Sequence, residues 1–198
     1  MEPISVTDSA SRFPVAERRL MLGIARDVIV AGTGQRQACV DRDNLAGPIN
    51  EQGACFVTLR KHRQLRGCIG SLEARRPLID DLVENAYAAA FRDPRFPPVD
   101  DDEIAYVHIH ISVLSPAVPM QFESEPELLS LIRPGIDGLI LEAGHHRGTF
   151  LPSVWEQVAD AREFLAHLKL KAGLPAQYWS DAVRVSRYTT ESFGEHDQ

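Results

Sequence analysis

The segment that most constrains the fold is residues 104–114, IAYVHIHISVL, in which apolar and polar side chains alternate. Val107, Ile109, Ile111 and Val113 fall on one face of an extended chain, and the residues between them fall on the other. Strict alternation is typical of a strand with one buried face, which antiparallel sheets accommodate more readily than parallel ones. The segment therefore predicts a strand in a largely antiparallel sheet.

The remaining patterns supply partners for this strand. Residues 54–59 and 65–72 read as two strands joined by a hairpin at 61–64, and residues 138–142 and 182–193 as later strands. Helices are expected at 15–31, with Leu20, Ile24 and Val28 inward, and at 77–92, with Leu78, Leu82, Ala86 and Ala90 inward. Shorter helices are expected at 126–132, at 152–157 and at 161–171, the last with Phe164, Leu165 and Leu168 inward. These elements predict an α+β fold: a mixed, largely antiparallel sheet flanked by helices, with a smaller lobe. We expect one domain over residues 1–198, with loose tails at 1–13 and 195–198.

The second predicted strand contains an unusual thiol, Cys68, in the sequence Leu65-Arg66-Gly67-Cys68-Ile69-Gly70, or LRGCIG. Glycine weakens a strand interior, and it often marks a bulge or the close approach of another group. Gly67 and Gly70 on either side of Cys68 therefore make this stretch a candidate site, with the two glycines as candidate substrate-binding positions.

LRGCIG followed by PLIDDLVENAYAAAFRDPRF, with ISVLSP at 111–116 and KAGLP at 171–175, resembles the AMMECR-type domain family, also called AmmeMemoRadiSam system protein A. The resemblance covers about residues 19–193. It implies a single α+β domain and a genomic association with Memo-like and radical-SAM proteins, but no established reaction. This chain departs from the family pattern at His110, at Ser153 and at the hairpin turn, where His62-Arg63 replaces a turn with glycine. We expect a looser turn there, because neither residue adopts a positive φ cheaply.

Composition excludes several classes of protein. The formal net charge of −7 disfavours general nucleic-acid binding, and no apolar run has the length of a membrane span. The three cysteines include no CxxC pair, which argues against a disulfide framework and a structural zinc site. With no signal-peptide pattern at the N-terminus, a reducing cytoplasm is the expected setting.

Cys68 has two interpretations. If Lys61 lies opposite Gln64, Val57 lies opposite Cys68, and Arg66 and Cys68 share a face with Cys55. A guanidinium near a thiol favours the thiolate, which would make Cys68 a nucleophile with Arg66 as its electrostatic partner. Alternatively, Cys68 is a small residue packed between glycines, since free cysteines are often simply buried.

Three further polar residues could line a cleft beside Cys68. Glu73, just beyond the strand, is the candidate general base. Asp93 and Arg95 flank Pro94 and could orient a substrate carboxylate or phosphate. Alternatively, Asp93 satisfies loop amides and Arg95 pairs with an acidic neighbour.

Histidines offer weaker candidates for a metal site. His108 and His110 project from one face of the predicted strand, and His145-His146 could supply a third ligand. We prefer a solvent-facing role, so no metal site is predicted and no cofactor is identified. Two hypotheses remain: an accessory component that works with Memo-like and radical-SAM proteins, or a cysteine-dependent enzyme using Cys68.

Overall fold

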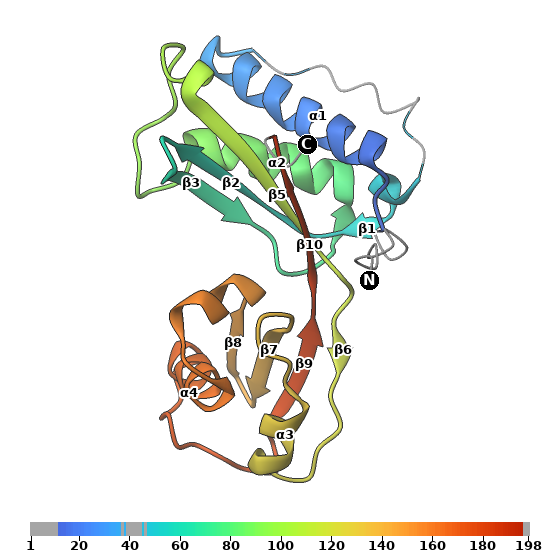
Figure 1. Cartoon of the computed structure of the whole chain (residues 1–198), viewed down its shortest axis with the longest axis vertical. Helices are drawn as coiled ribbons and strands as arrows, with labels where there is room; N and C mark the ends of the chain where they lie inside the picture. Colours follow the sequence, from blue (N-terminus) through green and yellow to red (C-terminus); the bar gives the residue numbers. More distant parts are fainter. Residues whose placement is uncertain (1–11, 37, 39–44, 46, 196–198) are drawn as a thin grey trace, which may run out of the picture. The chain divides into compact units, whose positions relative to one another are not determined.

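The computed structural model describes residues 12–36, 38, 45 and 47–195, and it divides into two compact units (Figure 1). Unit 1 comprises Met1–Val113 and Glu191–Gln198, and unit 2 comprises Leu114–Thr190. Helices combine with antiparallel strand pairs in both units, so the α+β prediction is confirmed. Among the described residues, no helix combines the length and the apolar character needed to cross a membrane.

Unit 1 contains two long helices and a four-stranded sheet. Its elements are α1 (Val15–Thr33), η1 (Pro48–Asn50), β1 (Gln52–Gly53), β2 (Cys55–Lys61), β3 (Gln64–Gly70), β4 (Arg76–Pro77), α2 (Leu78–Phe91), η2 (Ile104–Tyr106), β5 (Val107–Leu114) and β10 (Thr190–Gly194). The sheet order is β10-β5-β2-β3, and β2 pairs antiparallel with both β3 and β5. β1 and β4 form a separate small antiparallel pair.

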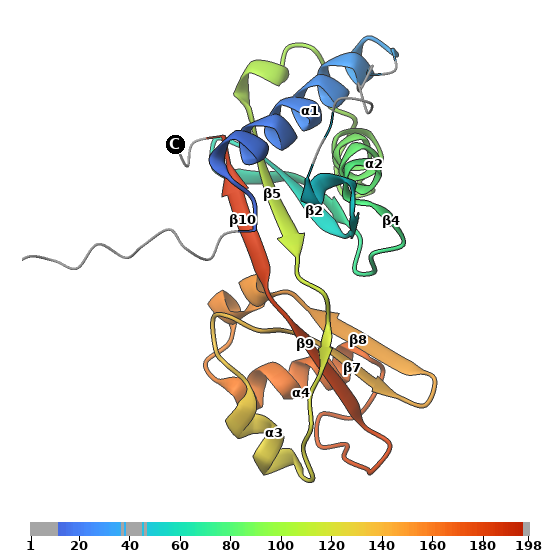
Figure 2. The ribbon, with the colours of Figure 1, turned by 90° about the vertical axis from the view of Figure 1, so that its right-hand side faces the viewer.

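One face of this sheet forms the core of unit 1, as the alternation predicts. Val107, Ile109, Ile111 and Val113 of β5 are buried, whereas the residues between them are only half-buried. Both helices lie on this face of the sheet and contribute to the same apolar core (Figure 2). The predicted stripe of α2 is confirmed, but Leu20 of α1 is exposed because Met21 and Leu22 take the inward positions instead.

The β2–β3 hairpin turn is tighter than the sequence suggests. Lys61 pairs with Gln64 as predicted, which leaves a loop of only two residues. His62 and Arg63 both have positive φ, 51° and 66°. This is the backbone pattern of the tight hairpin turns that match the twist of the strands, so the expected looser turn is wrong. The register of the sheet imposes the left-handed conformation in spite of its cost to residues other than glycine.

Unit 2 also combines a sheet with helices, and it has its own core. Its elements are β6 (Val118–Pro119), α3 (Glu125–Leu131), β7 (Gly138–Ala143), β8 (His146–Phe150), η3 (Pro152–Gln157), α4 (Ala161–Lys171) and β9 (Arg184–Tyr188). The sheet order is β6-β9-β7-β8, and the paired strands are antiparallel. Phe164, Leu165 and Leu168 of α4 pack into this core, as predicted.

The late strand expected at 182–193 is two strands. β9 belongs to the sheet of unit 2, whereas β10 belongs to the sheet of unit 1. The alternation continues through both strands, so the pattern alone does not reveal the change of sheet. At the ends of the described chain, Phe13 is buried in the core and Glu195 forms an ion pair with Arg26. Residues 1–11 and 196–198, and the unassigned Cys39, lie outside the described residues.

Candidate functional site

A β-bulge determines which way Cys68 points. Arg60 pairs with Leu65, but the next residue of β2, Leu59, pairs with Gly67, so Arg66 is an extra residue in β3. Beyond the bulge, Thr58 lies opposite Cys68 and Val57 opposite Ile69. The predicted pairing of Val57 with Cys68 is therefore wrong. Because side chains alternate between faces, one extra residue moves Cys68 to the face opposite Cys55 and Val57.

This face, called the open face below, is the one that does not pack against the core formed with α1 and α2. On this face, Cys68 is one end of a row of three polar side chains across three strands. Thr58 lies opposite Cys68 on one side and opposite His110 on the other. The Thr58 hydroxyl donates to Cys68 Sγ at 3.4 Å, and all three residues are half-buried. Cys55 is instead fully buried in the core, where desolvation, followed by the nearby Asp81 carboxylate, strongly raises the pKa of its thiol.

The backbone of Cys68 is fixed by Asp93 and Arg95, two of the predicted site residues. The Cys68 N–H donates to Asp93 Oδ2 at 2.9 Å, and Arg95 Nη2 donates to the Cys68 carbonyl at 3.0 Å. Arg95 also binds the Asp93 carboxylate at 2.7 Å. This hydrogen bond, with smaller contributions from the backbone N–H groups of Cys68 and Arg95, holds the pKa of the buried Asp93 well below its usual range.

Arg95 is also the guanidinium that interacts with Cys68. Its pKa is raised, mainly by the hydrogen bond to Asp93 and to a smaller extent by interaction with Cys68. Arg66, the expected partner of the thiol, binds Glu103 at 2.6 Å and the Pro98 carbonyl at 3.3 Å. Glu103 is shared with Lys61, and the hydrogen bond from Arg66, followed by that from Lys61, lowers the pKa of Glu103 to about 2.

The two glycines of the motif are explained by packing. A Cβ on Gly67 would lie 2.1 Å from the Ala89 carbonyl oxygen of α2, and one on Gly70 would lie 2.3 Å from the ring of Phe56. Such distances are far below van der Waals contact. The close approach predicted from the glycines is therefore that of the protein's own helix and aromatic ring. Their expected role in binding a substrate stays a prediction.

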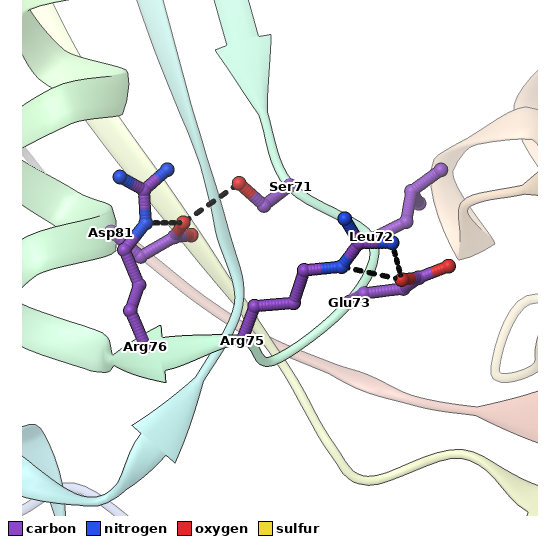
Figure 3. Close-up of a pocket in the computed structure, with 6 residues that line it drawn as sticks. All are labelled: Ser71, Leu72, Glu73, Arg75, Arg76 and Asp81. Carbon is purple, nitrogen blue, oxygen red and sulfur yellow. Dashed lines mark hydrogen bonds and ion pairs between the residues drawn. The ribbon is translucent and has the colours of Figure 1, made fainter.

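A pocket of about 470 Å³ opens where the chain leaves β3 (Figure 3). Ser71, Leu72, Glu73, Arg75, Arg76 and Asp81 line it. Glu73, the candidate base, forms an ion pair with Arg75 on the outer side of this pocket. The structure thus places Glu73 in the pocket, and its role as a base stays a prediction.

A buried carboxylate forms the inner wall of this pocket. Asp81 is 1% exposed and accepts four hydrogen bonds. Its Oδ1 binds the Ser71 hydroxyl at 2.7 Å and Arg76 Nε at 3.0 Å, while Oδ2 binds the Cys55 N–H at 3.0 Å and the Asn85 amide at 2.8 Å. The network ties the end of β3 to the first turns of α2.

The four histidines considered from the sequence lie in two separate groups. His108 and His110 lie in unit 1 opposite Arg60 and Thr58, whereas His145 and His146 stack on each other in unit 2. Within the part of the chain that the structure describes, no three His, Cys, Asp or Glu side chains are grouped as a metal ion would require.

Sequence reasoning missed Thr58, Glu103 and the Asp81 network. The role of Thr58 depends on the bulge, which no local pattern reveals. Glu103 ends the acidic run that begins at Asp100, and Asp81 lies in the first turn of α2, where acidic residues ordinarily face solvent and the helix dipole. In both cases, the arginine and lysine residues of the hairpin and of β4 are the signal in the sequence that these carboxylates have positively charged partners.

Comparison with known proteins gives consistent relatives. The AMMECR1 family model matches residues 22–193. A protein of Methanothermobacter thermautotrophicus is 44% identical over 155 residues, covering 77% of this chain and 81% of that protein. Protein MJ0810 of Methanocaldococcus jannaschii is 43% identical over 150 residues, covering 74% and 75%. The crystal structure of the uncharacterized protein PH0010 from Pyrococcus horikoshii matches with a TM-score of 0.82 and 30% identity, covering 94% of this chain and 95% of that one. This chain therefore belongs to the AMMECR1 family.

Proposed function

We propose that this protein performs thiol chemistry at Cys68, with the sulfur attacking an electrophilic atom of a substrate. The observation that carries the proposal is the setting of the thiol on the open face of the sheet. There its sulfur accepts a hydrogen bond from Thr58, and its backbone is held at both ends by Asp93 and Arg95. A fixed, partly exposed sulfur beside a positive charge is typical of reactive cysteines.

The neighbouring residues take different roles in this proposal. Thr58 orients the sulfur, and Arg95 supplies the positive charge. His110 lies two strands from Cys68, or roughly 10 Å, so it reaches the reaction only through the Thr58 hydroxyl or a bound substrate. Arg66 supports the hairpin through Glu103. Glu73 remains the proposed base, acting from the pocket at the end of β3.

The test is the rate of alkylation at each cysteine of the native protein, followed by mass spectrometry over a range of pH. We expect Cys68 to react faster than the cysteine of an unstructured peptide at neutral pH, and the buried Cys55 to react only after unfolding. Thr58→Val and Arg95→Gln should slow the labelling of Cys68. Arg92→Gln is the matched control, because Arg92 is an exposed arginine whose ion pair with Glu84 lies on α2. A rate equal to that of the peptide and unchanged in both variants would contradict the proposal.

A second candidate is an accessory role alongside a Memo-like or radical-SAM protein, the association that the family resemblance implies, with the hairpin as the docking surface. Two exposed apolar side chains favour it: Leu65, the first residue of the motif, and Tyr106, whose ring contacts His62 in the turn. Single exposed apolar residues are common, so the test is direct. Leu65→Asp and Tyr106→Asp should each weaken binding to a purified Memo-like or radical-SAM partner, while Leu170→Asp, at an exposed position in unit 2, should not. Equal binding by all three variants would contradict docking through the hairpin.

A further inference from the structure

We propose that the pocket at the end of β3 binds the carboxylate or phosphate group of a small molecule, with Arg76 as the anchor. The site shares Glu73 with the proposed function, but its evidence comes from the other lining residues and does not depend on the Cys68 thiol. Its volume of about 470 Å³ lies within the range of pockets that hold small-molecule ligands. The class of ligand follows from which polar groups of the lining are already engaged and which are available.

The buried carboxylate of Asp81 orients the Arg76 side chain. Its Nε donates to Asp81 Oδ1 at 3.0 Å, while the side chain as a whole is 44% exposed. Among the described residues, the two terminal nitrogens of Arg76 have no hydrogen-bond partner, and Figure 3 shows them extending beyond the contact with Asp81. A guanidinium fixed through Nε leaves a pair of parallel donors, which matches the geometry of a carboxylate or phosphate.

The acceptors of the pocket are engaged, which argues against a cationic ligand. The four hydrogen bonds to Asp81 cover both of its oxygens. Glu73 is held by Arg75, and Ser71 directs its hydroxyl hydrogen to Asp81. The terminal N–H groups of Arg76 remain available, and they favour an anion.

Arg75 gives the pocket a second positive charge that can turn to a ligand. Its side chain is 79% exposed, and its hydrogen bonds within the described chain are to Glu73 alone. Arg75 binds Glu73 through Nε and Nη2, so it can keep this ion pair and still offer Nη1 to a ligand oxygen. Leu72 adds an apolar surface to the lining. The expected ligand is thus a small acid with an uncharged body.

The test is a titration of the full-length protein followed by amide NMR shifts, with propionate and inorganic phosphate as separate probes and sodium chloride at matched ionic strength as the reference. We expect saturable shifts at Ser71, Arg75 and Arg76 with at least one probe and none with chloride. Tighter binding of propionate would identify a carboxylic acid ligand, and tighter binding of phosphate a phosphorylated one.

Variants separate this site from general charge effects. Arg76→Gln should weaken binding by roughly tenfold or more, as expected for a lost two-point charged contact. Arg75→Gln removes no buried contact, so it keeps the test valid if Arg76→Gln fails to fold, and it should weaken binding several-fold. Arg92→Gln removes the same charge from an exposed position on α2 and should leave binding unchanged. Shifts that do not saturate with either probe, or equal losses in all folded variants, would overturn the proposal.

Discussion

Replacing Gly67 by alanine should separate β3 from α2. The added Cβ would lie 2.1 Å from the Ala89 carbonyl oxygen, more than 1 Å inside normal contact, and the obstructing atom belongs to a helix backbone that cannot rotate away. Overpacking of this kind typically costs 1–3 kcal/mol, so we expect unit 1 to lose about 3 kcal/mol of its free energy of unfolding. In urea, a loss of that size moves the midpoint down by about 1–3 M.

Reporters within the chain distinguish the two units. Cys55 is fully buried in unit 1, so its alkylation at increasing urea concentration measures the opening of that unit. Both tryptophans, Trp155 and Trp179, lie in unit 2, so their fluorescence measures the unfolding of the other unit. Gly67→Ala should lower the Cys55 transition and leave the tryptophan transition unchanged.

Gly23→Ala in α1 is the matched control. No atom lies within 4 Å of a Cβ at Gly23, and alanine is favoured over glycine inside a helix, so this change should stabilise unit 1 by about 0.5–1 kcal/mol. If Gly67→Ala and Gly23→Ala had the same effect, the close packing of the motif on α2 would be refuted, and the glycines of LRGCIG would need another explanation.

Three further predictions concern charged groups held by ion pairs or hydrogen bonds. Glu103→Gln should remove a stabilisation that the wild type has above pH 4.5 and loses as the pH falls toward 2. This stabilisation is at most about 3 kcal/mol, reduced by solvent screening, and acid unfolding of both proteins followed by far-ultraviolet circular dichroism measures it. Asp81→Asn should destabilise unit 1 by about 2–4 kcal/mol, because the new amide NH₂ would face either the Cys55 N–H or Arg76 Nε, which are both donors. Cys55 labelling in urea measures the loss, and a value under about 1 kcal/mol would argue against the network. In unit 2, Glu125→Gln should cost about 3 kcal/mol, because it leaves the buried Lys169 ammonium without its ion pair. Lys169→Met should cost little, because it removes the buried charge itself. Tryptophan fluorescence in urea measures both losses, and the opposite order would contradict the reasoning.

The sequence predicts the element types of this protein well and its sheet register poorly. The stripes of α2 and α4 and the alternation of β5 identify their buried faces, because those periodicities reflect burial directly. The register of the hairpin depends on the extra residue Arg66, and a bulge leaves no periodic signal over so short a strand. An error of one residue in the register therefore places Cys68 on the wrong face of the sheet.

The candidate site could be located but not assembled from the sequence. The glycines identify the stretch around Cys68, and Asp93 and Arg95 do lie against it. Thr58 and Glu103 are distant from the motif in the sequence, and they contact its residues only because of how the strands and loops pack in the fold. The left-handed turn at His62 and Arg63 follows from the same register, which overrides the preference of those residues.

The position of β10 has a consequence for the order in which this protein is made. Unit 1 begins near the N-terminus, but its sheet includes residues 190–194, and Glu195 bonds both Arg26 and the Ile109 backbone. During synthesis, β5 therefore emerges without its outer neighbour, and all of unit 2 follows before β10 is available. At 5–20 residues per second, this delay lasts roughly 4–15 s, during which an unpaired strand edge is open to other nascent chains. Of these two units, unit 1 begins first and is completed last, and its solubility in that interval depends on how well β5 is shielded.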